Sequence, residues 1–256
     1  MRFQRRSLPR MAIGFGAALG WLGARPAWAA EIGVLCSNGL QSVMEALRPR
    51  FEAASGDRID VVFGASNVLK ERIDGGAAFD LTVLTPALIE QLIQSGRVAR
   101  GSERTIARAG LGLAVRAGAP RPDISTLAAF RQTLLEAESI IYSAAGQSGI
   151  GFLHAIDTMG IGAEVRAKAR PNSSGPNGAI VARGEAQMAV QLIPELLPVP
   201  GIDVVGPFPP DVQSWVVLAG GVATNAASAV RARALLDFLA GAENAAAICE
   251  KGLEPA

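Results

Sequence analysis

The sequence predicts an α/β fold of two lobes, each a mainly parallel sheet flanked by helices. Short apolar runs of strand length alternate with segments whose apolar residues recur at helical spacing. The chain of 256 residues holds more of these alternating strand and helix segments than one compact sheet usually contains. Loops of small residues also follow strands in both halves of the chain. A single doubly wound domain is the competing interpretation.

The N-terminal segment, residues 1–29, has the features of a signal peptide. Four arginines precede an apolar run over residues 11–23, and Ala27-Trp28-Ala29 fits a small-x-small cleavage site. An uncleaved anchor is the alternative, but the run is shorter than the ~20 residues that span a bilayer. The pair Arg5-Arg6 leaves both the general and the twin-arginine export routes open. We expect a periplasmic protein that is cleaved near Ala29.

The charge of the expected mature chain argues against some partners. Without residues 1–29 it holds 19 basic and 23 acidic side chains, a net charge of −4. This sign disfavours nucleic acid or an anionic membrane surface as the partner. No later apolar stretch reaches membrane-spanning length. We expect a monomer.

Cysteine and histidine are too few for a metal centre. Cys36 and Cys249 could form one disulfide in an exported protein, or they could be two separate thiols. Their spacing in the sequence does not distinguish these alternatives. There is one histidine, His154, and no Cys-x-x-Cys motif. We therefore expect neither a metal site nor a cofactor.

The first part of the chain predicts three strands, each followed by a helix. The strands are residues 32–36, 59–63 and 79–84. The apolar stripe of the first helix consists of Leu40, Val43, Met44, Leu47 and Phe51. Gly56 is a natural end for this helix, and Gly75-Gly76 ends the next. Thr85-Pro86 opens the third helix, and Gly96 closes it.

The second part predicts a further α/β unit and a return to the first. The expected strands are residues 111–118, 139–142, 186–193 and 214–222, with another inside 197–210. The expected helices are 127–138, 150–159, a segment ending at Arg183, 228–241 and 242–252. The runs 111–118 and 214–222 serve as the two crossings between lobes. Lobe 1 is then residues 30–112 and 216–256, and lobe 2 is residues 113–215.

Four loops of small residues point to a ligand site. They are CSNG (36–39), FGASN (63–67), SAAGQSG (143–149) and PNSSGPNG (171–178), two in each expected lobe. Each opens a helix, where unpaired N–H groups and a partial positive charge suit an anion. Ligands of open α/β sheets bind at this edge. Ordinary helix capping would explain any one loop, but it explains four less well.

The loops contain no lysine, arginine, histidine, aspartate or glutamate. A carboxylate binder would usually supply an arginine fork, whereas a dianion without protons needs only donors. Neutral donors alone therefore favour a compact oxyanion of the sulfate or molybdate kind, or a small neutral ligand.

Catalytic motifs are weak. Ser148 lies in GQSGI, which misses the Gly-x-Ser-x-Gly elbow because Ile150 replaces the last glycine. His154 is more consistent with packing or solvent exposure than with a role as a base. No phosphate loop with lysine occurs, and no Gly-x-Gly-x-x-Gly follows a strand. Without a nucleophile–base pair, we expect a protein that is not an enzyme.

The order of four stretches resembles the periplasmic solute-binding proteins of ABC importers, specifically the molybdate-binding family. The stretches are FGASNVLKERIDGGAAFDLTVL, IARAGLGLAVRAGAPRPDIST, SIIYSAAGQSGIG and the terminal KGLEP. Together they span nearly all of the expected mature chain. The resemblance implies a two-lobed, type II-like periplasmic binding protein fold with a hinge. It also implies a ligand held between the lobes by backbone amides and hydroxyls.

The resemblance also implies positions for the ligand contacts. The family's second-loop serine falls on Ser66, beside Asn67, and its third-loop contact falls on Ser148, before Gly149. Its first-loop serine falls on Gly39, so this chain offers a backbone N–H there, with Ser37 and Asn38 adjacent. The fourth-loop contact falls near Ser174. The family's late tyrosine has no counterpart, and Gln191 or Leu192 occupies its region.

The sequence thus predicts an exported receptor that captures a small molybdate- or tungstate-like anion and delivers it to a membrane ABC permease. The nearest alternative is a binding protein for a small organic ligand, in transport or sensing. An enzyme on the same scaffold is the third and least favoured.

Overall fold

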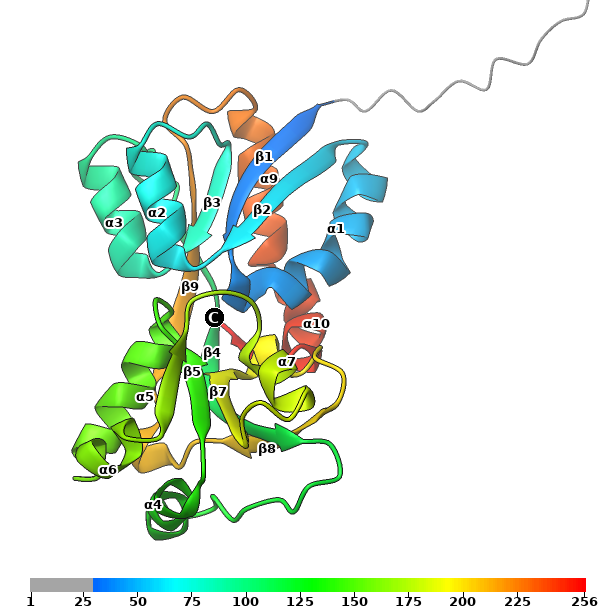
Figure 1. Cartoon of the computed structure of the whole chain (residues 1–256). Helices are drawn as coiled ribbons and strands as arrows, with labels where there is room; N and C mark the ends of the chain where they lie inside the picture. Colours follow the sequence, from blue (N-terminus) through cyan, green and yellow to red (C-terminus); the bar gives the residue numbers. More distant parts are fainter. Residues whose placement is uncertain (1–29) are drawn as a thin grey trace, which may run out of the picture.

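The computed structural model describes residues 30–256, which form two lobes, one above the other in Figure 1. The predicted signal peptide lies outside the described residues. The strands are β1 (Glu31–Ser37), β2 (Arg58–Gly64), β3 (Leu81–Leu84), β4 (Arg104–Arg116), β5 (Ile140–Ser143), β6 (Ala169–Asn172), β7 (Met188–Leu192), β8 (Ile202–Pro207), β9 (Trp215–Val222) and β10 (Leu253–Pro255). They join in the order β2-β1-β3-β9-β4-β7-β5-β6, with β8 and β10 also paired to β4.

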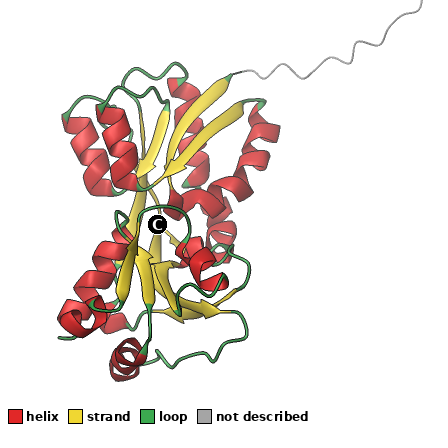
Figure 2. Ribbon diagram, viewed as in Figure 1, coloured by secondary structure: helices red, strands yellow, loops and turns green. Residues whose placement is uncertain are grey.

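Helices flank the sheet in both lobes (Figure 2). They are α1 (Gln41–Ser55), α2 (Ser66–Asp74), α3 (Pro86–Gln94), α4 (Leu127–Glu136), α5 (Gln147–Thr158), α6 (Gly162–Arg166), α7 (Asn177–Ala182), α8 (Ile193–Leu196), α9 (Ala229–Leu239) and α10 (Ala245–Glu250). Three short 3-10 turns complete the set: η1 (Asn38–Leu40), η2 (Pro210–Val212) and η3 (Ala242–Asn244). This is the predicted two-lobed α/β fold.

Parallel pairing dominates inside each lobe, and antiparallel pairing joins them. In the first lobe β1 lies between β2 and β3, parallel to both. In the second lobe β5 lies between β6 and β7, again parallel to both. The carboxyl ends of β1, β2, β5 and β6 lead into the four loops of small residues. The two parallel sets therefore present these loops toward the space between the lobes (Figure 1).

Strand β4 runs through both lobes. Its first half pairs with β9 in the first lobe, and its second half pairs with β7 and β8 in the second. At the changeover, the side-chain amide of Gln213 holds Leu111 twice. Gln213 Oε1 accepts from the Leu111 N–H at 2.9 Å, and Gln213 Nε2 donates to the Leu111 carbonyl at 3.0 Å. The predicted lobe boundaries fall near this point in β4 and in β9, and they stay a prediction.

Several elements differ from the expectation. Strand β4 begins at Arg104 rather than at residue 111, because residues 104–110 also pair with β9. This upstream part carries two exposed arginines and an irregular register, so its sequence lacks the pattern of a strand. Strand β6 was expected to be a turn. It contains Pro171, which the edge of a sheet tolerates, and β6 ends the strand order. Residues 193–196 form helix α8 rather than the end of a strand and the start of a loop.

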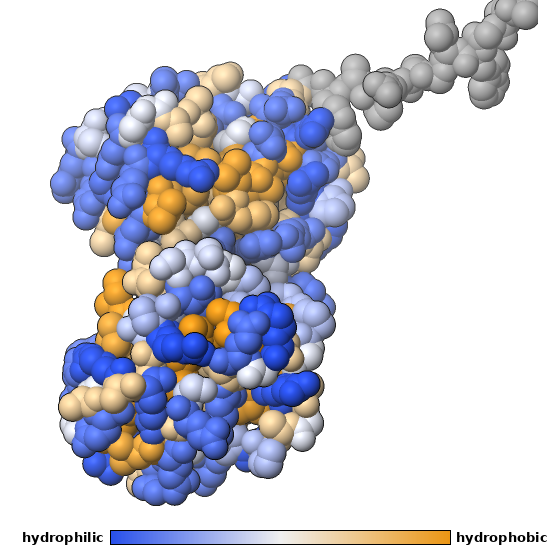
Figure 3. Space-filling model, in the orientation of Figure 1, coloured by the Kyte–Doolittle hydropathy of each residue, from blue (hydrophilic) through white to orange (hydrophobic). Residues whose placement is uncertain are grey.

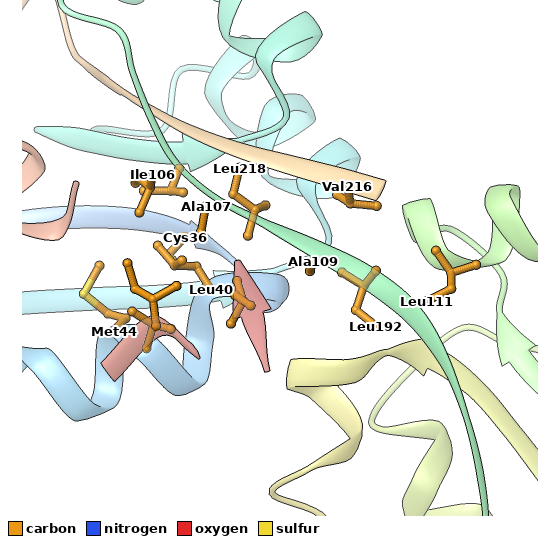
Figure 4. Packing of buried hydrophobic residues seen from close by; sticks show 14 of the residues in the cluster. Cys36, Leu40, Met44, Ile106, Ala107, Ala109, Leu111, Leu192, Val216 and Leu218 are labelled. Carbon is orange, nitrogen blue, oxygen red and sulfur yellow. The ribbon is translucent and has the colours of Figure 1, made fainter. Parts of the chain in front are cut away.

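One apolar core continues from lobe to lobe along β4. Figure 4 shows Cys36, Leu40, Leu192 and Leu218 among the residues grouped around this strand. A Cβ built at Gly39 would lie 3.1 Å from Leu192 Cδ1, so the first loop packs closely on the second lobe. Smaller clusters lie under α2 and α3 and under α7. The continuous core fixes where the two parallel sets meet.

Cys36 is buried and Cys249 is exposed, and both are free thiols. Burial raises the pKa of the Cys36 thiol far above its usual range, so it stays protonated.

Among the described helices, none combines the length and apolar character needed to cross a bilayer.

Candidate functional site

The four loops line one cavity of about 450 Å³ between the lobes. In the space-filling view the molecule narrows at this level (Figure 3). Of the nine residues predicted from the sequence, the cavity wall includes Ser37, Asn38, Ser66, Asn67, Ser148, Ser174 and Gln191. Gly39 and Gly149 lie behind that wall, where both are buried. Ligand contact by these residues stays a prediction, but the structure brings seven of them to one place.

The first-lobe wall is built from two helix starts. Ser37 ends β1 and Ser66 begins α2, and the Ser66 hydroxyl donates to Ser37 Oγ at 3.1 Å. Ser37 Oγ also accepts from the Gly39 N–H at 3.4 Å. A hydroxyl group has one proton to donate. Ser66 donates its proton to Ser37, so the Ser37 hydroxyl can donate its own proton to a ligand. Ala65 occupies the N-cap position of α2 without a side-chain hydrogen bond, and Ser66 is the first residue of the helix.

Ser148 faces the cavity from the first turn of α5 in the second lobe and is buried. The turn before it is very tight, because a Cβ at Gly149 would lie 1.8 Å from the Ser143 carbonyl oxygen. Only glycine permits this approach of α5 to the end of β5. The close approach places the Ser148 backbone and hydroxyl at the mouth of the helix.

A buried amide network orients Gln191. The Asn177 N–H donates to Gln191 Oε1 at 2.9 Å, and Asn177 Nδ2 donates to the Val190 carbonyl at 2.8 Å. Asn172 Nδ2 in turn donates to Asn177 Oδ1 at 3.0 Å. Because Gln191 accepts through Oε1, its Nε2 donors remain for the Glu195 carboxyl and the cavity.

Two ionisable residues in the wall were missed by the sequence reasoning. Arg72 lies on the exposed side of α2, and its acidic neighbour Asp74 is paired with Lys70 instead, at 2.5 Å. Glu195 lies in α8. The loops are uncharged, as the sequence shows, but the cavity as a whole is not. The four loops supply neutral donors only, and the two charged side chains reach the cavity wall from helices.

The environment of Glu195 changes its acidity. Although the residue as a whole is only partly buried, its carboxyl is desolvated, and this raises the pKa of Glu195 to about 7. Interactions with the Leu192 backbone and the Gln191 side chain lower the pKa and oppose this effect. A carboxyl group with such a pKa is present in both protonation states near neutral pH.

A second cavity of about 510 Å³ adjoins the first and lies between α1 and the α7–α8 region. Asn38, Gly175, Gln191 and Glu195 line both cavities. Glu195 therefore belongs to the partition between them. Within residues 30–256, no three histidine, cysteine, aspartate or glutamate side chains gather closely enough to hold a metal ion.

Residues 32–254 match the family described as bacterial extracellular solute-binding proteins. The chain belongs to this family. Membership supports a small-ligand-binding protein outside the cytoplasm, of the kind that serves an ABC permease. The predicted cleavage near Ala29 and the monomeric state stay predictions.

Solved structures agree on the fold. The periplasmic molybdate-binding protein of Azotobacter vinelandii has a TM-score of 0.74 and 18% identity, covering 87% of this chain and 98% of its own. The substrate-binding domain of a putative molybdenum ABC transporter from Clostridium difficile has a TM-score of 0.70 and 16% identity, covering 89% and 100%. At these identities the likeness establishes the two-lobed fold and leaves the ligand open.

A curated relative corrects the expectation that this protein is not an enzyme. An aconitate isomerase from a Pseudomonas species is 35% identical over 258 residues, covering 97% of each chain. The expectation rested on missing nucleophile–base and metal motifs. Those motifs serve hydrolysis and group transfer, whereas a proton shift within a substrate needs only one well-placed acid–base group.

Proposed function

We propose that this protein is an exported isomerase of aconitate, or of a closely related unsaturated polycarboxylate, which it binds between its two lobes. The observation that carries this proposal is the 35% identity to an aconitate isomerase across 97% of both chains. The solute-binding fold supplies the cleft. In the proposed function the bound ligand is isomerised rather than delivered to a transporter.

The wall of the cavity suits a polycarboxylate. Arg72 offers a charge-assisted donor for one carboxylate, and the neutral donors of both lobes offer hydrogen bonds to others. A volume of about 450 Å³ lies in the range of sites for small organic ligands. A tetrahedral oxyanion would leave most of this space to water.

The chemistry needs no oxidant and no transferred group. In an unsaturated tricarboxylate, removing a proton from the methylene carbon and returning one to the far alkene carbon moves the double bond. The new double bond forms in either geometry, so the shift interconverts cis and trans isomers. Such a site requires a carboxylate clamp and one acid–base residue, and the cavity contains Arg72 and Glu195.

The direct test is an isomerisation assay on the purified protein. cis-Aconitate and trans-aconitate are incubated separately, and the two isomers are resolved by chromatography. We expect both reactions to reach the same mixture at a rate proportional to protein concentration. The saturated analogue tricarballylate should bind and inhibit without reacting. Absence of conversion from either isomer would contradict the proposed function.

A second candidate is a receptor that captures a small solute and hands it to an ABC permease. The family match over residues 32–254 and the likeness to molybdate-binding structures favour it. A receptor binds its ligand unchanged. Thermal-shift measurements with molybdate, sulfate, aconitate and tricarballylate separate the two, since bound ligand raises the melting temperature. Stabilisation by molybdate, without turnover of aconitate, would favour the receptor.

A further inference from the structure

The cavity between the lobes contains only two ionisable side chains, Arg72 and Glu195, among the described residues. A guanidinium does not give up its proton in proteins, so Arg72 is unsuited to proton transfer. The serine hydroxyls are no better, because a serine needs an adjacent base and Ser66 has only Ser37 as its partner. Among the residues that line the cavity, Glu195 remains as the acid–base group.

The two residues come from opposite walls. Arg72 projects from α2 of the first lobe, and Glu195 projects from α8 of the second. Helix α8 follows β7 directly, and the neighbouring Gln191 is fixed through Asn177. The backbone that carries Glu195 is therefore anchored to the sheet, and a substrate held by Arg72 across the cavity would meet it from the other side.

We propose that Glu195 carries the proton between the two carbons of the substrate's allylic system while Arg72 holds a substrate carboxylate. This inference rests on the proposed isomerase function. The Glu195 carboxylate takes a proton from the methylene carbon, and the C–H electron pair forms the new double bond. The electrons of the old double bond move onto the far carbon and its carboxylate. That carbon then takes the proton back from Glu195, so the enzyme ends unchanged.

The surroundings of Glu195 suit both halves of this step. Burial places its pKa at about 7, so the carboxylate is available as a base and the acid is available to return the proton. The other ionisable groups in the walls of the two cavities that Glu195 lines are Glu45 and Arg72. Glu45 accepts a hydrogen bond from Gln41 at 2.8 Å in the adjoining cavity, outside the cavity that contains Arg72.

The test compares Glu195→Gln with Glu45→Gln, a matched change of a glutamate in the adjoining cavity. Glu195→Gln keeps the size and most hydrogen bonds of the side chain but cannot take a proton. We expect its kcat for aconitate to fall by roughly 10²- to 10⁴-fold. Its calorimetric affinity for tricarballylate should stay within a few-fold of the parent protein. Glu45→Gln should keep kcat within about twofold.

A second variant, Glu195→Asp, protects the test against a folding defect. A shorter carboxylate should retain partial activity, and the acidic limb of its kcat/KM profile should move, whereas the parent profile should fall below about pH 7. A residue with a purely structural role would change neither the position of that limb nor kcat at constant affinity.

The outcomes separate the two proposals. If the parent protein isomerises aconitate and Glu195→Gln does so at a similar rate, the role of Glu195 is wrong and the proposed function stands. An unchanged acidic limb in Glu195→Asp would lead to the same conclusion. If the parent protein converts neither isomer, the proposed function fails, and the role of Glu195 fails with it.

Discussion

The two walls of the cleft are built from similar loops but contribute different chemistry. The first-lobe wall has two joined serines, Ser37 and Ser66, and the cation Arg72. The second-lobe wall has a buried amide network around Gln191 and the acid Glu195. In the proposed reaction, the first wall would attract and hold the anion, and the second would orient it and exchange a proton. A receptor needs only the first set of properties, so the proposed isomerase would differ from a receptor in its second wall.

The walls also differ in how closely their loops pack against neighbouring atoms. Alanine substitution of one glycine in each wall should reveal this difference, with the largest expected effect on stability. A Cβ at Gly149 would lie 1.8 Å from a backbone carbonyl, whereas one at Gly39 would lie 3.1 Å from the mobile end of the Leu192 side chain. Gly149→Ala should cost about 3 kcal/mol or more and lower the melting temperature by about 10 °C. Gly39→Ala should cost about 1 kcal/mol or less. Calorimetric scans of both variants measure this, and equal losses would show that the two loops are equally constrained.

The charge on the first wall is probed by Arg72→Gln. Loss of one charge-assisted contact from an exposed side chain should weaken tricarballylate binding about 10-fold. Lys70→Gln is the matched control, because Lys70 lies on the same helix but pairs with Asp74 outside the cavity lining. Isothermal titration gives both affinities. A Lys70 variant that loses as much as the Arg72 variant would mean that general charge, rather than a local contact, attracts the ligand.

The serine pair of the first wall should have a smaller effect. Ser66→Ala removes the hydrogen bond that orients the Ser37 hydroxyl toward the cavity, so we expect a loss of about 0.5–1.5 kcal/mol of binding free energy, or roughly 2- to 10-fold in affinity. Ser66→Asp puts a negative charge where the ligand's carboxylate is expected, so it should weaken binding far more. The helix start should stay intact, because an acidic residue in the first turn suits the helix dipole. Titration of both variants with tricarballylate checks the order. Tight binding by Ser66→Asp would place the anion away from this serine.

The smallest expected effect concerns stability and pH on the second wall. The pKa of Glu195 is about 7 in the folded protein, above its ordinary value near 4.5, so the folded state holds this proton more tightly than the unfolded state. The stabilisation is complete below the unfolded value and is lost as pH rises through about 7. Melting temperatures at pH 5 and pH 8 should therefore differ more for the parent protein than for Glu195→Gln. An identical difference in both would contradict the raised pKa.

Much of the cleft could be predicted because its loops are local features of the sequence. A run of small residues after a buried strand marks a helix start whatever the rest of the chain does, and Ser37, Ser66 and Ser148 were found in this way. Sheet pairing then brings the loops together, since carboxyl ends of parallel strands share an edge.

The two charged residues could not be found from loops, because they reach the cavity from helices. Arg72 had one signal, namely its position four residues after exposed Val68, opposite the buried pair Leu69 and Ile73. The position of Glu195 on a helix could not be predicted, because the apolar run of β7 continues directly into α8. Pro194 at the start of a helix, followed by an acid, was the available signal. The raised pKa of Glu195 depends on packing that no local pattern records.

Strand β4 and the Gln213 amide that holds it at Leu111 have a mechanical consequence. The two hydrogen bonds hold both peptide units of Leu111 at the point where the strand leaves one lobe for the other. The strand can bend or twist about this residue, but sliding along its length would break both bonds. If the lobes move as the predicted hinge implies, these bonds favour rotation about Leu111 over sliding of the strand. Arg72 and Glu195 lie in different lobes, so such a rotation would change the distance between them across the cavity.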